Sequence, residues 1–327
     1  MAFLFFYYRS MKGRIGGSGR LVRLVNCLGG KVIDSPIANE YFVGNIGIYF
    51  LQNFTLFLKS IKYAKQISAY NIVIFQPYSL PGSIIPLFIK SLQRGVVIVD
   101  DVNFHSLIEP LLIRLFSKFI HVIWTSSIYT LSQFKYYFGN RFFIYYIFTP
   151  LLPKLNIYSM SKKANLILFA GSRSFERYSK IAWEICYIAK QLPNFKFVLV
   201  GVASEALIGK CPYQNVIVLG RVPDQIYSNL LKLARYVLVF DNAEYIYPGG
   251  MLIKIVDALE YGAYPIISRQ FKYTLPFLKT VNVVSDIYKI IRDNEAFQEI
   301  EYFIKLYSCK NLLKFLKLSK IVRNNTK

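Results

Sequence analysis

The stretch PGGMLIKIVDALEYGAYPII, residues 248–267, combines three signals that together predict one α/β unit. Its first three residues, one proline and two glycines, predict a loop, because these residue types interrupt regular structure. A run of helical period then begins at Met251 and ends at Gly262, and glycine is the residue that most often terminates a helix. The apolar run after it predicts a buried strand. A loop, a helix and a buried strand in this order are typical of a parallel sheet.

The same alternation extends outward from this unit over the whole chain. The predicted strands are 2–8, 71–77, 95–101, 121–127, 142–147, 165–171, 196–201, 215–220, 236–240 and 264–268. The predicted helices are 20–28, 51–67, 83–93, 106–119, 128–138, 176–192, 224–235 and 251–261. Strands that alternate with helices indicate doubly wound α/β domains. We therefore predict the α/β class, with two Rossmann-like domains that face a central cleft.

A change of composition near the middle separates the two series of strands and helices. PLLPKLNIYSMSKKA, residues 150–164, is rich in proline, serine and lysine, as linkers are. The chain has 327 residues, which is enough for two domains. The predicted divisions are an N-terminal Rossmann-like domain at 1–152, a linker at 153–163, a second Rossmann-like domain at 164–290, and a basic helical tail at 291–327.

The apolar content predicts well-filled cores. Hydrophobic residues make up 54% of the chain, which excludes a disordered protein. No uninterrupted apolar run reaches the ~20 residues that a membrane-spanning helix needs. The opening run MAFLFFYY is short and its basic residues follow it, whereas a signal peptide carries them before its apolar part. We therefore expect this run to form a buried first strand.

The charge of the chain predicts an anionic partner. Lysine and arginine number 40 against 18 acidic residues, for a net charge of +22 and a pI near 9.7. Nucleic acid, acidic lipid headgroups and phosphorylated substrates all fit such a charge. The basic residues are spread along the chain without an arginine-rich run or zinc-finger spacing, which disfavours nucleic acid. An anionic membrane surface is a further candidate partner, since basic, aromatic-rich segments bind such surfaces.

The four cysteines are far apart in the chain and form no Cys-x-x-Cys pair. With two histidines they make no familiar zinc pattern, so we expect reduced thiols in a cytoplasmic protein. The inner face of the membrane is a candidate place of attachment. Of the histidines, His121 precedes a predicted buried strand, and we expect a structural role for it.

Three segments of the second half carry residues suited to a phosphorylated ligand. FAGSR (169–173) ends a strand before a helix that begins near Arg177, and helix N-termini attract anions. NVIVLGRVP (215–223) ends a strand at Gly220, where backbone can approach a ligand. Lys254 and Asp257 are three residues apart and so share a helix face, where they suit phosphate and ribose hydroxyls. The alternatives are an ordinary turn with a solvated arginine and a surface ion pair.

The order of these segments resembles the donor-binding domain of GT-B glycosyltransferases, in particular the retaining, group 1, family-4-like class. In that class a strand-Gly-Arg is followed by a helix, a strand-Val-Gly, N-V-x-x-x-G-x-V and G-M-P-x-K-x-x-E-A-x-A-x-G-x-P-V-I. The corresponding segments here are FAGSR, KFVLVG, NVIVLGRV and GGMLIKIVDALEYGAYPII. The resemblance covers residues 164–268 well. It extends more loosely over the first half, through GGSGR, VDDVNFH and IWTSS.

The resemblance implies an activity. A sugar, of the hexosyl type, would pass from a nucleotide-diphosphate-sugar donor to a glycan, lipid-linked or protein acceptor, with retention of configuration. It implies no cofactor and no obligatory metal. Asp100 and Asp101 agree with this, because adjacent strand residues point to opposite faces and make a poor metal clamp.

The resemblance also implies roles for individual residues. Arginines would contact the diphosphate, the glycine loop would offer backbone groups to the phosphates, and Asp257 would replace the glutamate that binds the ribose. By this resemblance the donor-binding residues would be Arg173, Arg177, Val222, which would lie near the base, Gly249, Gly250, Met251, Lys254 and Asp257. The residues on the side of the sugar and the acceptor would be Gly16, Gly17, Ser18 and Glu244. The catalytic residue would be His105, for which a plain loop histidine is the alternative.

One departure from the family leaves alternatives open. The family has two glutamates separated by seven residues, where this chain has Gly249 and Asp257. A different donor, a compensating carboxylate from Glu244 or Asp241, or reduced activity would each account for the missing first glutamate. A GT-B protein that binds a sugar nucleotide without transfer, or a related epimerase, is the second hypothesis. A basic nucleic-acid-binding protein is the third.

Overall fold

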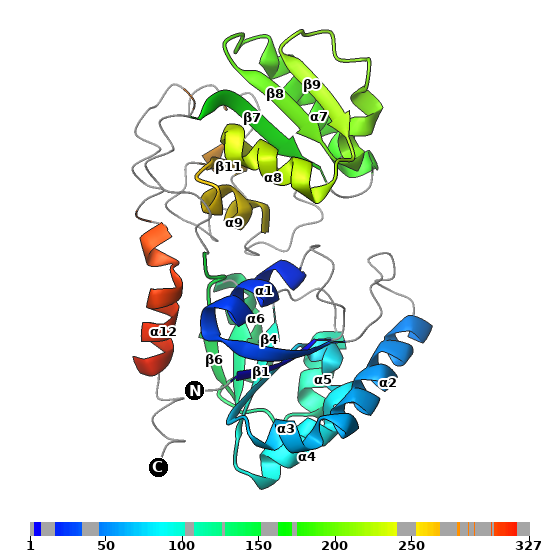
Figure 1. Ribbon diagram of the computed structural model, residues 1–327, viewed down its shortest axis with the longest axis vertical. Helices are drawn as coiled ribbons and strands as arrows, with labels where there is room; N and C mark the ends of the chain where they lie inside the picture. The colour runs from blue at the N-terminus through cyan, green and yellow to red at the C-terminus, as the bar shows by residue number, and fades with distance from the viewer. Residues whose placement is uncertain are drawn as a thin grey trace. The chain divides into compact units, whose positions relative to one another are not determined.

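A computed structural model of the chain shows two compact units, one of Met1–Pro150 with Cys309–Lys327 and one of Leu151–Ser308. The predicted tail at 291–327 is thus divided between them. Each unit contains one six-stranded sheet (Figure 1). The structure describes residues 3–7, 17–34, 46–101, 108–125, 128–151, 163–171, 175–240, 253–268, 280–281, 287, 291, 302 and 304–318.

The sheet of the first unit is parallel throughout. Its strands, in spatial order, are β2 (Gly30–Asp34), β1 (Phe3–Tyr7), β3 (Ile72–Phe75), β4 (Val96–Asp101), β5 (Val122–Thr125) and β6 (Phe143–Tyr146). All five residues of β1 are buried, as predicted for the opening apolar run. The strand β2 was not predicted, because its sequence GKVID is short and its position at the sheet edge leaves it partly exposed.

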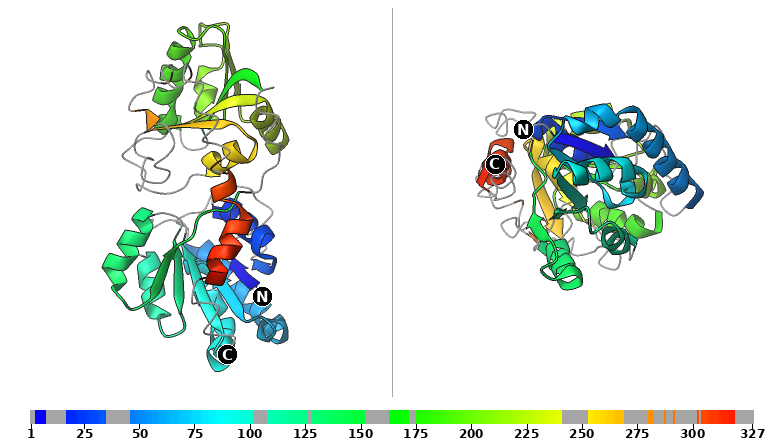
Figure 2. Two further views of the ribbon diagram at one scale, coloured as in Figure 1. Left: turned by 90° about the vertical axis from the view of Figure 1, so that its left-hand side faces the viewer. Right: turned by 90° about the horizontal axis from the view of Figure 1, so that it is seen from below.

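Helices cover both faces of this sheet (Figures 1 and 2). Since successive strand residues point to opposite faces, the core divides into two clusters. One cluster joins Phe3 and Phe5 to leucines of α1 (Gly17–Leu28) and α12 (Cys309–Leu318). The other joins Leu4 and Phe6 to helices of the opposite layer, which are α2 (Ile46–Lys62), α3 (Ala64–Ser68), α4 (Ile84–Leu92), α5 (Ile108–Leu115) and α6 (Ile128–Phe138).

The sheet of the second unit is also parallel. Its strands, in spatial order, are β12 (Thr280–Val281), β11 (Tyr264–Ser268), β10 (Ala234–Val239), β7 (Ala164–Ala170), β8 (Lys196–Val200) and β9 (Val216–Gly220). Its helices are α7 (Phe175–Ala189), α8 (Asp224–Leu233), α9 (Ile253–Glu260) and the 3-10 helix η4 (Val202–Leu207). The strand β12 was not predicted, because two residues carry no periodicity. The helix and strand that opened the sequence argument correspond to α9 and β11, and the predicted loop before them lies outside the described residues.

The cysteines are paired, and the prediction of free thiols is wrong. Cys27 of α1 bonds to Cys309 of α12, with their Cα atoms 5.3 Å apart, and Cys186 bonds to Cys211, with 6.3 Å between Cα atoms. The first pair is separated by 282 residues in the chain. Sequence spacing does not show such a pairing, because folding alone brings the two helices together.

None of the described helices is both long enough and apolar enough to cross a bilayer.

Candidate functional site

Three glycines mark the carboxyl ends of adjacent strands in the second unit. Gly171 follows β7, Gly201 follows β8 and Gly220 ends β9. The Gly171 amide donates to the Val200 carbonyl at 2.9 Å, and the Gly201 amide donates to the Gly220 carbonyl at 2.6 Å. The ladder of hydrogen bonds therefore continues to the last residue of each strand. Ligands of open α/β sheets bind beyond this edge.

Backbone packing at this edge excludes side chains. Gly201 has φ of +96°, and a Cβ atom there would lie 2.0 Å from the Gly171 carbonyl oxygen. Gly220 has φ of +64°, in the left-handed region that favours glycine. A larger residue at Gly201 would require the backbone to shift, whereas one at Gly220 would be strained by the positive φ and would meet the Glu205 side chain at 3.0 Å. The backbone segments therefore approach one another closely at this edge.

A lysine lies at the same edge. Lys254, in the first turn of the described part of α9, donates a hydrogen bond from its Nζ atom to the carbonyl oxygen of Ala170, the last residue of β7. Its side chain is half-buried. The ammonium group thus lies one residue from Gly171, at the centre of the sheet edge. A positive charge fixed at the carboxyl ends of the strands suits an anionic ligand.

Asp257 lies one turn further along α9 and is half-buried. Its negative charge reaches Tyr227 of α8, whose pKa is raised above the ordinary value by burial first and then by Asp257 and Tyr261. The phenol of Tyr227 therefore stays neutral at physiological pH. Asp257 of α9 therefore lies close enough to α8 to act on Tyr227.

The remaining predicted site residues fall into two groups. Val222 is half-buried between β9 and α8, Gly17 and Ser18 begin α1, and Arg177 lies in the first turn of α7, without a described side chain. The other predicted residues lie outside the described residues, and they are Gly16, His105, Arg173, Glu244, Gly249, Gly250 and Met251.

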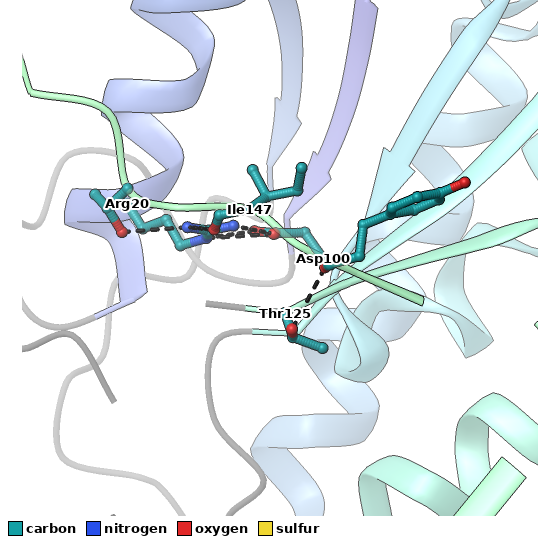
Figure 3. A network of polar contacts seen from close by, with 6 residues as sticks. Arg20, Asp100, Thr125 and Ile147 are labelled. Carbon is teal, nitrogen blue, oxygen red and sulfur yellow. Dashed lines mark hydrogen bonds and ion pairs between the residues drawn. The ribbon is translucent and has the colours of Figure 1, made fainter. Parts of the chain in front are cut away.

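The structure adds a buried ion pair in the first unit that the sequence analysis missed (Figure 3). The side chain of Arg20 is fully buried, and its Nη2 atom lies 2.8 Å from Oδ1 of Asp100. Its Nη1 atom donates to the Ile147 carbonyl at 2.8 Å and to the Thr149 hydroxyl at 3.2 Å. Beside this group, the hydroxyl of Thr125 donates to the Tyr145 carbonyl at 3.4 Å.

This ion pair positions the start of α1. Arg20 lies in the first turn of α1, directly after the glycine-rich segment, and Asp100 lies at the carboxyl end of β4. The guanidinium group therefore links the helix to the carboxyl end of β4 and to the segment that follows β6. In the sequence both residues appeared separately, Asp100 as one of two adjacent aspartates and Arg20 as one of many basic residues. The sequence therefore showed each residue but not their pairing, because 80 residues separate the two partners.

The chain is similar to known proteins in its structure and not in its sequence. No family model and no curated protein sequence matches the chain. Its structure is similar to that of HepE from Anabaena, solved with UDP and glucose, with a TM-score of 0.62, 12% identity, and 96% of this chain and 98% of that chain covered. It is similar to α,α-trehalose 6-phosphate synthase from Burkholderia multivorans, with a TM-score of 0.66, 9% identity and 99% of each chain covered.

A glycosyltransferase from Rickettsia africae is a third similar structure, with a TM-score of 0.62, 13% identity and 99% of each chain covered. All three similarities extend over nearly the full length of both chains. At such low identity they establish the architecture, and the predicted fold class is confirmed. The chain is a mixed α/β protein with the two-domain GT-B fold.

Proposed function

We propose that this protein is a glycosyltransferase that takes a sugar from a nucleotide-diphosphate-sugar donor. The observation that carries the proposal is the edge of the second sheet, where Lys254 and two left-handed glycines lie at the ends of β7, β8 and β9. In the GT-B fold this is the edge at which a nucleotide is expected, because ligands of parallel sheets bind beyond the carboxyl ends of the strands.

The proposed chemistry depends on charge. When the bond between the sugar and the diphosphate of the donor breaks, negative charge develops on the departing diphosphate. Preorganised positive groups stabilise that charge most where water is scarce. We propose that Lys254, Arg173 and Arg177 supply this stabilisation, with backbone amides of Gly250 and Met251. The proposed reaction needs no obligatory metal or cofactor.

The nucleoside part of the donor has proposed partners as well. Asp257 would accept hydrogen bonds from the ribose hydroxyls, and Val222 would contact the base. The ligands of similar structures support this choice of donor. HepE has been solved with UDP, with UDP and glucose, and with UDP-glucose. HepE shares 12% identity with the chain, so the identity of this chain's own sugar and base is left to experiment.

The finer parts of the proposal concern the sugar and the acceptor. We propose a hexosyl donor, transfer with retention, and a glycan, lipid-linked or protein acceptor that binds to the first unit near Gly16, Gly17 and Ser18. His105 is proposed to act on the transferred sugar, and Glu244 to supply the carboxylate that Gly249 lacks. Because Gly249 replaces a glutamate of the family, binding of the donor without transfer is the second candidate function.

The proposal can be tested by a thermal-shift screen over UDP- and GDP-sugars, followed by an assay for released nucleoside diphosphate. A ligand that binds the native state raises the melting temperature. A stabilising donor that is also consumed supports the transferase. Stabilisation without turnover supports the second candidate, and the absence of any stabilising nucleotide sugar contradicts both.

A further inference from the structure

Two helices of the first unit present apolar side chains to solvent. On α2 the exposed residues are Phe50, Leu51, Phe54, Leu58 and Ile61, and on α4 they are Ile84, Phe88 and Leu92. Apart from the adjacent Phe50 and Leu51, neighbouring members of each set are three or four residues apart, which places each set on one side of its helix. Phe50 is 64% exposed, Phe88 59% and Leu92 71%. We call these eight residues the apolar face.

The inner sides of the same helices combine apolar core residues, among them Leu56 and Leu87, with buried polar groups. Gln52, Asn53 and Ser60 of α2 are buried, and Lys90 of α4 is 1% exposed. An Asn53 carboxamide oxygen accepts a hydrogen bond from the Gly82 amide at 2.8 Å, and Lys90 donates to the Tyr70 carbonyl and to the Gln93 side chain. Both helices therefore bury residues against the sheet and also present large apolar groups outward. An ordinary surface helix has a polar outer side, so the apolar face is suited to a partner.

The two helices form one continuous layer. The segment before α4 lies directly against α2, since a Cβ atom at Gly82 would be 2.5 Å from the Asn53 carbonyl oxygen. The helices α2 and α4 contact each other and lie on the same side of the sheet (Figure 1). The residues of the apolar face point away from that sheet on both helices.

The segments that carry the apolar face contain basic residues and no acidic ones. Residues 41–99 contain five lysines and arginines and no aspartate or glutamate. Of the basic residues, Lys62, Lys65 and Arg94 are exposed. A second copy of the chain would bring like charges together at this face, which disfavours self-association. Anionic lipid headgroups complement the charge, while their acyl chains accept the apolar side chains.

We propose that the apolar face, with Lys62, Lys65 and Arg94 around it, docks the protein on the surface of an anionic membrane. The phenylalanines would enter the boundary between headgroups and acyl chains, and the basic side chains would lie among the phosphates. The docking involves the first unit alone and does not depend on the donor site of the second unit. An enzyme held in this way would act on acceptors at the membrane surface.

The test is co-sedimentation of the full chain with vesicles. We expect binding to vesicles of equal parts phosphatidylglycerol and phosphatidylcholine, weaker binding to phosphatidylcholine alone, and weakening by salt. The variant Phe50→Ser, Phe54→Ser, Phe88→Ser should lose binding by a factor of about ten or more. The variant Lys62→Glu, Lys65→Glu, Arg94→Glu should lose its preference for the anionic vesicles.

A matched control carries Tyr187→Ser, Ile217→Ser and Leu219→Ser, which remove exposed apolar side chains from the second unit. It should bind vesicles as the wild type does. The proposal is overturned if the wild type ignores anionic vesicles, or if the control loses as much binding as the phenylalanine variant. It is also overturned if ultracentrifugation without lipid shows a dimer that the phenylalanine variant dissociates.

Discussion

Arg20 and Asp100 form a buried ion pair at the carboxyl edge of the first sheet, with Nη2 of Arg20 2.8 Å from Oδ1 of Asp100. The Nε atom lies 3.2 Å from both carboxylate oxygens, so the planar guanidinium group is shared by the whole carboxylate. Both side chains are buried, so water does not solvate either charge in place of its partner. Each charge therefore depends on its partner for compensation.

Removing one member of this pair should destabilise the first unit strongly. We expect Arg20→Met to lower the free energy of unfolding by about 3–5 kcal/mol, because it leaves the Asp100 carboxylate buried without its cation. Urea unfolding measures the change. The double variant Arg20→Met, Asp100→Leu should lose less than the sum of the two single variants. Strict additivity would contradict the pairing.

Gly201→Ala should destabilise the second unit. The new Cβ atom would meet the Gly171 carbonyl oxygen at 2.0 Å, so the strand ends must separate. We expect a loss of at least about 3 kcal/mol in thermal or urea unfolding. Gly209→Ala is the control, because Gly209 also has a positive φ, +70°, but no described atom lies within 4 Å of a Cβ there. It should cost about 1 kcal/mol, and equal losses in both variants would argue against the close approach.

Lys163 should give the second unit a pH-dependent stability. Its amine donates to the carbonyls of Leu231, Lys232 and Ala234 at the end of α8. Burial lowers its pKa from 10.5 to about 8. Between these values the unfolded chain holds more protons on this amine than the folded chain does. The free energy of unfolding should therefore rise with pH across that window, by at most about 1.4 kcal/mol per pH unit.

The comparison for this prediction is Lys163→Met, which has no amine to titrate. We expect it to be less stable overall, because three carbonyls lose their donor, and to lack the rise that the wild type shows. Urea unfolding at a series of pH values from 7 to about 11 measures both effects. Parallel curves for the two proteins would contradict the lowered pKa.

Lys254→Met should weaken binding of the nucleotide-sugar donor found in the proposed screen. Loss of a charge beside the diphosphate should raise Kd by about tenfold or more, and calorimetry measures it. Lys232→Met is the control, because Lys232 is an exposed lysine of α8 whose side chain contacts Asn229. Arg177→Ala should resemble Lys254→Met. Unchanged binding in both variants would contradict the proposed donor site.

The cysteines should be unreactive toward thiol reagents in the folded, unreduced protein. Both pairs are bonded, so thiol titration before and after reduction checks the prediction. Reduction should lower the melting temperature. The bond between Cys27 and Cys309 closes a loop that contains most of the chain, and closing a long loop raises the free energy of the unfolded state by ~4–5 kcal/mol. Four reactive thiols in the native protein would contradict the pairing.

Local patterns determined much of the fold. The apolar run at the start of the chain predicted β1, and the segments from FAGSR to YPIIS predicted β7, β8, β9 and β11 in their order. Periodicity is a property of neighbouring residues, so it can be read from the sequence. Where a strand is short or lies at an edge, as β2 and β12 do, the pattern is too weak to show it.

The candidate site was predicted only in part. The sequence alone indicated that Lys254 and the strand-end glycines belong to one ligand-binding edge, because parallel strands end at the same side of a sheet. The tertiary structure decided the rest: that Lys254 reaches Ala170, that Arg20 pairs with Asp100, that Cys27 bonds to Cys309, and that the apolar side of α2 faces solvent. Each of these depends on contacts between residues far apart in the chain or on the side of a helix that the sheet covers. Composition and periodicity do not specify either.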